Sequence, residues 1–162
     1  MSLLPYRNIV GALIFAAVTT RIDIAYAVNK CAQFMANPGK NHWNALINIL
    51  VYLRTYPDLV IKFSRPTDPT YLNALSFFVD SDHGGDVDTS RSTTGFVGLF
   101  NNGPVSYSSK RQKIASGSGT AQSEYRAIYY CSQEAIYNRQ LVEDLGFPPR
   151  YPTIYVKTIN HQ

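Results

Sequence analysis

One stretch, from Phe77 to Phe96, constrains the fold more than any other part of the 162-residue chain. An apolar run at 77–79 leads into an acidic cluster, and a polar sequence at 91–95 leads into a second apolar run. The acidic cluster consists of Asp80, Asp82, Asp86 and Asp88. This order of residues predicts a strand, an acidic loop and a returning strand.

The acidic cluster has two interpretations. A carboxylate at the end of a buried strand, such as Asp80, is costly unless something pairs with it. A metal ion is one such partner, because hard cations such as Mg²⁺ prefer oxygen ligands. The plainer interpretation is a solvated loop in which Asp82, Asp86 and Asp88 face water. The stretch alone leaves both open, since isolated motifs are often false positives.

The patterns on either side of this stretch predict an α/β fold. The first third of the chain has apolar residues at helical spacing and predicts three amphipathic helices. A proline-containing linker at 64–70 follows. Strands are predicted at 72–79, 95–100, 105–109 and 153–156. A long helix is predicted at 120–145, so that a three-stranded antiparallel meander precedes the helix and a fourth strand follows it.

The long helix carries the second acidic candidate. Its buried face is predicted from its large apolar residues and one alanine. These are Tyr125, Ile128, Tyr129, Ala135, Ile136, Leu141 and Leu145. Glu124 lies in the first turns, where a carboxylate interacts favourably with the helix dipole. It can also point over the sheet toward the strand of Asp80, so that two carboxylates converge on one metal site, and the spacing permits either arrangement.

The charge of the chain is compatible with a nucleic-acid partner without requiring one. The net charge is +4 and the isoelectric point is about 9.1. A local cluster of cations, Lys110, Arg111 and Lys113, follows the third predicted strand. These three residues are candidate contacts to nucleic acid, with a solvated loop as the alternative.

The chain is expected to be intracellular, in the cytoplasm or nucleus, rather than secreted or bound to a membrane. The apolar run at 9–18 is too short to span a bilayer, and no small-residue cleavage pattern follows it. The cysteines, Cys31 and Cys131, each lie in a predicted helix and indicate buried apolar side chains in a reducing compartment. The oligomeric state is not predicted.

Several motifs together resemble one family. The first third contains YRNIVGAL at 6–13, TRIDIAYAV at 20–28 and HWNAL at 42–46. The second part contains DSDHGGD at 80–86, RSTTG at 91–95 and AQSEYRA at 121–127. In this order they resemble the end of the Pol polyprotein of copia-type retrotransposons, where the tail of reverse transcriptase joins the ribonuclease H domain. The resemblance extends from Tyr6 to about Val156.

The resemblance implies an organisation and a chemistry. Residues 1–63 would be the helical reverse-transcriptase tail or connection segment, 64–70 a linker, and 71–162 a truncated domain with an incomplete ribonuclease H-like fold. Ribonuclease H cleaves the RNA strand of an RNA–DNA hybrid with two Mg²⁺ ions held by four carboxylates. Asp80 matches the ligand on the first strand and Glu124 the ligand on the helix. The other acids of the cluster have no metal role by this resemblance.

The chain departs from the family near its end. The third carboxylate belongs directly after the run at 154–156, where this chain has Lys157, and 158–162 does not resemble the family. The fourth carboxylate is expected further on. An ammonium group at a ligand position repels Mg²⁺. We therefore expect weak or absent Mg²⁺ binding and little or no nuclease activity from the chain alone. The changed end is expected of a truncated or frame-shifted copy, or of an altered exon end.

Two other functions remain open at this stage. The first is a domesticated module that binds nucleic acid or protein without catalysis. The second is a nuclease whose missing ligands come from another chain. Metal binding separates the nuclease from the other interpretations, and salt-dependent binding of a hybrid would indicate retained nucleic-acid contacts.

Overall fold

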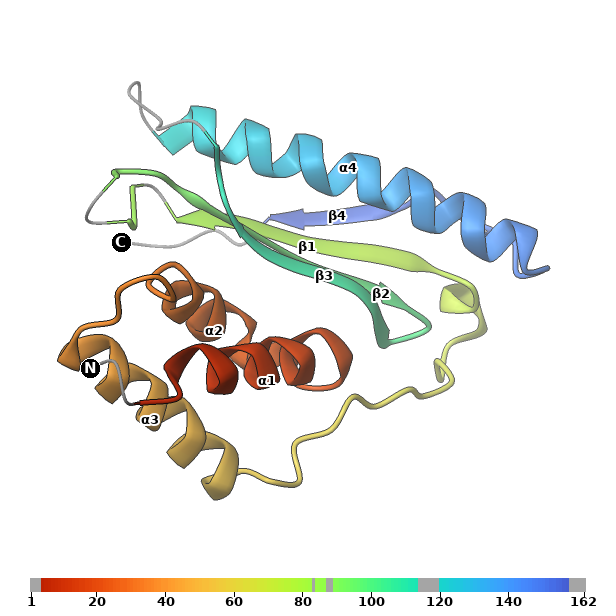
Figure 1. Cartoon of the computed structure of the whole chain (residues 1–162). Helices are drawn as coiled ribbons and strands as arrows, with labels where there is room; N and C mark the ends of the chain where they lie inside the picture. Colours follow the sequence, from red (N-terminus) through yellow and green to blue (C-terminus); the bar gives the residue numbers. More distant parts are fainter. Residues whose placement is uncertain (1–3, 83, 87–88, 114–119, 158–162) are drawn as a thin grey trace. The chain divides into compact units, whose positions relative to one another are not determined.

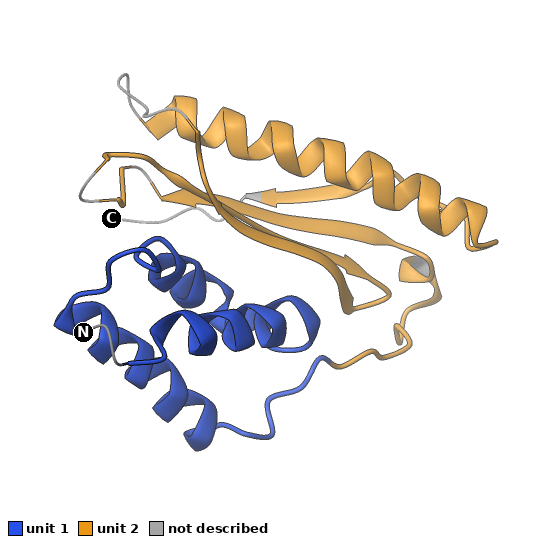
Figure 2. Ribbon diagram, in the orientation of Figure 1, with its two compact units in different colours: residues 1–61 blue, residues 62–162 orange. Residues whose placement is uncertain are grey.

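The computed structural model describes residues 4–82, 84–86, 89–113 and 120–157, apart from the side chains of Thr70 and Lys157. The chain divides into two compact units, unit 1 at 1–61 and unit 2 at 62–162 (Figure 2). The predicted division into domains at 1–63, 64–70 and 71–162 stays a prediction.

Unit 1 is helical. Its helices are α1 (Tyr6–Thr19), α2 (Ala25–Ala32) and α3 (Lys40–Thr55), with a short 3-10 helix, η1 (Ile22–Ile24), before α2. Apolar side chains spaced by one helical turn fill its core. The buried members are Tyr6, Val10, Leu13, Ala17, Ile24, Val28, Cys31, Leu46 and Ile49. The Tyr6 hydroxyl donates to the carbonyl oxygen of Cys31 at 2.8 Å, so the one polar atom of this buried side chain has a partner.

Unit 2 is a four-stranded mixed sheet with a long helix along one face (Figure 1). Its elements are η2 (Pro69–Tyr71), β1 (Leu75–Asp82), β2 (Thr93–Phe100), β3 (Gly103–Arg111), α4 (Thr120–Asp144) and β4 (Ile154–Lys157). The strand order is β3-β2-β1-β4. The β1–β2 and β2–β3 pairs are antiparallel and the β1–β4 pair is parallel. The predicted α/β fold class, with its meander, long helix and fourth strand, is confirmed.

The turn between β2 and β3 has a local cause. Asn101 and Asn102 both have positive φ, 48° and 64°, which asparagine tolerates better than most residues. The side chain of Asn101 accepts a hydrogen bond from the backbone N–H of Asn73 at 2.6 Å. The same residue therefore forms the hairpin turn and attaches it to the segment before β1.

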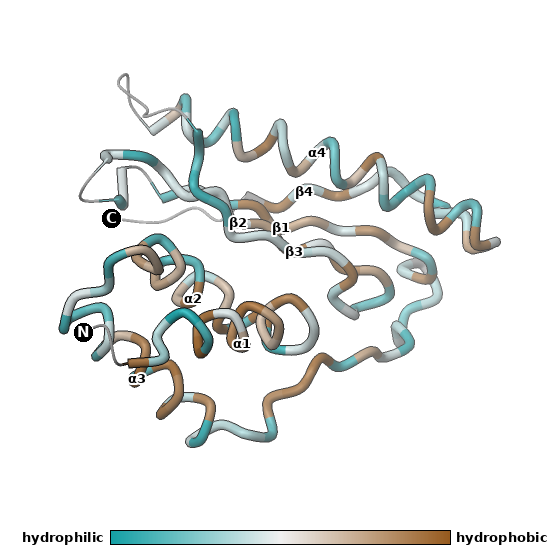
Figure 3. The backbone as a smooth tube through the Cα atoms, viewed as in Figure 1, coloured by the Kyte–Doolittle hydropathy of each residue, from teal (hydrophilic) through white to brown (hydrophobic). Residues whose placement is uncertain are grey.

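Strand β1 alternates between two faces. Leu75, Phe77 and Val79 are buried in the core shared with α4, whereas Phe78 is 42% exposed. This period of two is the expected pattern for a strand with one covered face. Figure 3 shows the apolar part of β1 in brown.

The buried face of α4 differs from the predicted one. The buried residues are Ser123, Ala127, Cys131, Ala135, Asn138 and Val142. Only Ala135 was predicted; Tyr125 and Leu145 are 74% and 63% exposed. Small side chains on this face let the helix approach the sheet closely, while large apolar residues lie on other faces, which gives α4 its mixed colouring in Figure 3. Neither α4 nor another helix in the described ranges is long and apolar enough to cross a membrane.

Candidate functional site

Asp80 and Glu124 line one shallow depression in unit 2. Asp80 lies near the end of β1 and Glu124 in the early turns of α4. The depression is completed by Val79, Ser81, Ala127 and Ile128. Its volume is about 10 Å³, which is about the space for one water molecule. Two residues that the sequence singled out, one on the strand and one on the helix, therefore line the same depression.

A buried polar layer connects the elements that carry these carboxylates. The Ser81 hydroxyl donates to the Ser123 hydroxyl at 3.3 Å, which in turn donates to the carbonyl oxygen of Thr120 at 2.7 Å. The Gln112 amide donates to Thr94 Oγ1 at 3.1 Å and to the carbonyl oxygen of Ser123 at 3.0 Å. Ser81 and Ser123 are the direct neighbours of Asp80 and Glu124 in the chain, so these bonds position the start of α4 against β1 and β2.

Asp86 is a structural centre of the acidic loop. It is 5% exposed. Its carboxylate accepts hydrogen bonds from the Thr89 backbone N–H at 2.9 Å and the Thr89 hydroxyl at 2.7 Å, and from Arg111 Nη1 at 3.1 Å. The hydrogen bonds from Thr89, helped by Arg111, lower the pKa of Asp86 to about 2. The interpretation of this loop as solvated was wrong for Asp86, because a buried carboxylate is stable where donors and a cation surround it.

Asp82 also shapes the loop. Its carboxylate accepts a hydrogen bond from the backbone N–H of Thr93, and the Ser92 hydroxyl accepts one from the backbone N–H of Gly84 at 3.2 Å. Asp82 is half-buried, so it too departs from the solvated interpretation. Asp88 lies outside the described residues.

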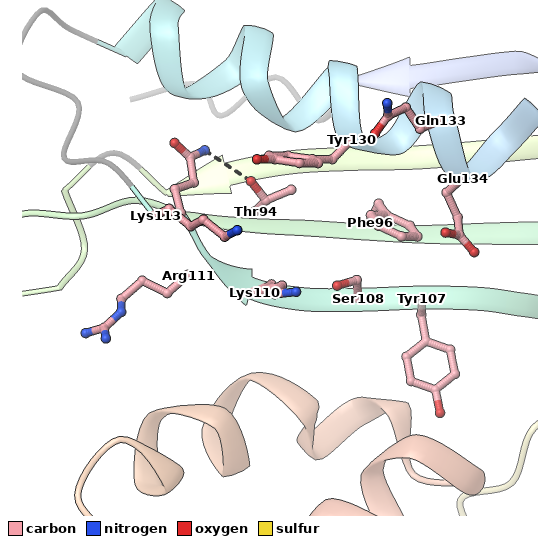
Figure 4. A pocket seen from close by; sticks show the side chains of 11 residues that line it. Thr94, Phe96, Tyr107, Ser108, Lys110, Arg111, Lys113, Tyr130, Gln133 and Glu134 are labelled. Atoms are coloured by element: carbon pink, nitrogen blue, oxygen red, sulfur yellow. Dashed lines mark hydrogen bonds between the residues drawn. The ribbon is translucent and has the colours of Figure 1, made fainter.

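Lys110, Arg111 and Lys113 line one groove at the edge of the sheet (Figure 4). The groove has a volume of about 500 Å³. Its other lining residues are Thr94, Phe96, Tyr107, Ser108, Gln112, Tyr130, Gln133 and Glu134. Lys110 and Lys113 are exposed, while Arg111 is half-buried and forms an ion pair with Asp86 at 3.1 Å. The cation cluster therefore has two kinds of members, exposed lysines and an arginine that also supports the acidic loop.

Position 157 lies on the strand next to β1, close in register to Asp80. The parallel pairing of β4 with β1 places Lys157 opposite Val79, the residue before Asp80. Within the described parts of the chain, no group of three or more His, Cys, Asp or Glu side chains is placed to hold a metal ion. Asp80 and Glu124 are therefore the acidic residues that line the described depression, and residues 158–162 lie outside the described residues.

The meander, the long helix and the parallel fourth strand give unit 2 an incomplete ribonuclease H-like fold. Comparison with known proteins identifies the family. The chain is 37% identical over 155 residues, 96% of its length, to the Pol polyprotein of transposon TNT 1-94 from Nicotiana tabacum. It is 39% identical over 149 residues, 92% of its length, to the Pol polyprotein of transposon RE2 from Arabidopsis thaliana. The chain belongs to the family of copia-type retrotransposon Pol polyproteins.

These relatives differ greatly in length from the chain. The matched segment makes up 11% of the TNT 1-94 polyprotein and 10% of the RE2 polyprotein. A shorter relative, secreted RxLR effector protein 161 of Plasmopara viticola, is 36% identical over 137 residues, which cover 85% of this chain and 93% of that protein. No protein-family model matches the chain, and no solved structure matches it.

Proposed function

We propose that unit 2 is the ribonuclease H-like region of a copia-type Pol polyprotein, with Asp80 and Glu124 as metal ligands of a weakened site and little or no nuclease activity. The observation that carries this proposal is that Asp80 of β1 and Glu124 of α4 line one depression. RNA–DNA hybrid is the substrate class that the family resemblance implies. Residues 1–63 are the reverse-transcriptase tail or connection segment under the same proposal.

The donor set supports weak rather than strong metal binding. In ribonuclease H-like enzymes, two Mg²⁺ ions flanking the scissile phosphate supply the catalytic chemistry. Asp80 and Glu124 offer the hard oxygen atoms that Mg²⁺ prefers. A lysine stands at 157, where the family has a carboxylate, and β4 pairs this position with Val79 beside Asp80. Two carboxylates, with a lysine at the sequence position of a third ligand, do not fit a pair of Mg²⁺ ions.

Cleavage of a labelled RNA–DNA hybrid in Mg²⁺ tests the proposal. The natural chain and the variant Asp80→Asn are both expected to leave the hybrid intact. Titration calorimetry with MgCl₂ provides a second measurement. Lys157→Asp is expected to bind Mg²⁺ about tenfold or more tightly than the natural chain, because it replaces a repulsive charge by an oxygen ligand.

Lys157→Gln is the matched control for this substitution. It removes the positive charge without adding a ligand, so its gain in Mg²⁺ affinity should be the smaller of the two. Cleavage by the natural chain that Asp80→Asn abolishes would show an active nuclease and contradict the proposed inactivity. Equal Mg²⁺ affinity of Lys157→Asp and the natural chain would contradict the assignment of position 157 as the missing ligand.

A binding module without catalysis is the second candidate. The groove of about 500 Å³ favours it, because Lys110, Arg111 and Lys113 line this groove. Binding of a hybrid that falls steeply with salt, without cleavage, is the expected result, since contacts to phosphates release counterions. Salt-independent binding, or no binding, would count against this candidate.

A further inference from the structure

The groove between the edge of the sheet and α4 has the form of a ligand site. The register pairs Thr94 with Lys110 and Phe96 with Ser108, and Phe96 packs against the core under α4. These four residues therefore share the face of the sheet that α4 covers. Tyr130, Gln133 and Glu134 form the helix side of the groove, while Tyr107 and Arg111 point away from α4 (Figure 4). A volume of about 500 Å³ lies within the usual range of small-ligand pockets, about 300–1,000 Å³.

The groove offers aromatic surface to a ligand. Tyr130 extends from α4 and is 47% exposed, and Phe96 on β2 is half-buried. Both line the groove (Figure 4). An exposed aromatic ring beside a second ring is a suitable surface for a planar base, because every nucleobase has a π-face that stacks.

Charge is distributed unevenly along the groove. Figure 4 shows Lys110 and Lys113 toward one end and Glu134 toward the other. The Glu134 carboxylate accepts a hydrogen bond from the Ser106 hydroxyl at 2.7 Å. Gln112 is 5% exposed, and its Oε1 is buried with no hydrogen-bond partner in the described parts of the chain. The groove thus combines a positively charged end, two aromatic lining residues and an unsatisfied hydrogen-bond acceptor.

We propose that this groove binds one nucleotide, with its base against Tyr130 and Phe96 and its phosphate near Lys110 and Lys113. The nucleotide belongs to an unpaired nucleic-acid strand, and a free mononucleotide has the same chemistry. This inference rests on the nucleic-acid binding proposed above but concerns a site separate from Asp80 and Glu124. Arg111 is left out, because it points away from α4 and pairs with Asp86.

Binding of a fluorescent single-stranded oligonucleotide of about ten nucleotides, measured by anisotropy in EDTA, tests the proposal. The double variant Lys110→Gln/Lys113→Gln is expected to bind about fivefold or more weakly. Its plot of log affinity against log salt should be less steep by about 0.7, since the two lysines contact one phosphate and each phosphate contact to a single strand contributes about 0.7. The matched control Lys40→Gln/Lys62→Gln removes the same charge from exposed positions outside the groove and should keep the natural slope.

A second substitution tests the aromatic wall. Tyr130→Leu keeps an apolar side chain but removes the stacking ring, and a loss of about fivefold or more in affinity is expected. Tyr137→Leu is the control, because Tyr137 is 60% exposed on the same helix and does not line the groove. Displacement of the oligonucleotide by AMP would identify a free mononucleotide as sufficient, whereas displacement by unlabelled strand alone would identify the strand as the ligand.

The proposal is overturned if both groove variants bind like the natural chain, or if the control variants lose as much affinity as the groove variants. Because the assay contains EDTA, its result does not depend on metal binding at Asp80 and Glu124. If the oligonucleotide assay contradicts the groove proposal while weak Mg²⁺ binding is observed, the groove is not a nucleotide site. The proposed ribonuclease H-like function would still stand.

Discussion

At the scale of single residues, Asp86 shows how one carboxylate organises a loop. It accepts hydrogen bonds from both donors of Thr89, and the guanidinium of Arg111 at the end of β3 reaches it across the chain. The backbone carbonyl oxygen of Asp86 also accepts a hydrogen bond from the backbone N–H of Ser90 at 2.7 Å. The acidic loop is therefore attached to the sheet through a buried charge, and this charge should make the stability of the protein depend on pH.

Asp86→Asn tests that dependence. Asparagine keeps an acceptor for Thr89 but loses the charge facing Arg111, so the variant should be less stable by roughly 1–3 kcal/mol at neutral pH. The pKa of Asp86 is lowered from 3.8 to about 2, so its charge stabilises the fold above pH 3.8 and this contribution is lost as the pH falls toward 2. Urea unfolding at several pH values should therefore show the difference between the two proteins shrinking from about pH 4 down to 2.

Asp58→Asn serves as the control for Asp86→Asn, because Asp58 is exposed in the turn after α3. It should change stability by less than about 0.5 kcal/mol. A difference between Asp86→Asn and the natural chain that is constant down to pH 2 would contradict the assigned role of the Asp86 charge.

At the scale of elements, sequence patterns predicted the strands and helices better than the packing between them. Turn residues and periodicity are local, so the antiparallel meander and the extent of α4 could be predicted. The motifs also marked Asp80 and Glu124, which the structure brings to one depression. Gln112 could not be found, because its partners Thr94 and Ser123 come from β2 and α4 and no local pattern connects them. The buried face of α4 was predicted wrongly for the same reason, because it depends on contacts with strands that no local pattern connects to the helix.

The packing of α4 on the sheet leads to a prediction about Ala127. This residue is 1% exposed and belongs to the core with Leu75, Phe77 and Val79. Ala127→Leu adds a branched side chain at a buried position where the helix packs on the sheet, so a loss of about 1–3 kcal/mol in unfolding free energy is expected. Ala121→Leu, at an exposed position of the same helix, should be nearly neutral. Equal urea midpoints for the two variants would show that the helix does not pack through this face.

At the scale of the whole molecule, the chain consists of two units joined by an irregular segment. Residues 57–66 contain neither helix nor strand, and within them Leu59, Val60 and Phe63 are 48%, 76% and 65% exposed. The predicted linker at 64–70 overlaps the end of this segment. Phe63, Ser64 and Arg65 line a hollow with Phe100, Asn101 and Val105 from the β2–β3 hairpin, so unit 2 includes the residues directly after the boundary. The part of this segment most accessible to a protease is therefore its earlier part, around Leu59 and Val60.

Limited digestion of the full chain with thermolysin tests this organisation. Thermolysin cleaves before large apolar residues, and exposed backbone without regular hydrogen bonding is cut first. The first cut is expected before Leu59 or Val60, giving two fragments that mass spectrometry identifies. The double variant Leu59→Ser/Val60→Ser should delay this cut, whereas Phe15→Ser, which removes an exposed apolar residue within α1, should not. A first cut inside α4 or β1 would contradict the division into two units, because it would place the weakest part of the chain within the core of unit 2.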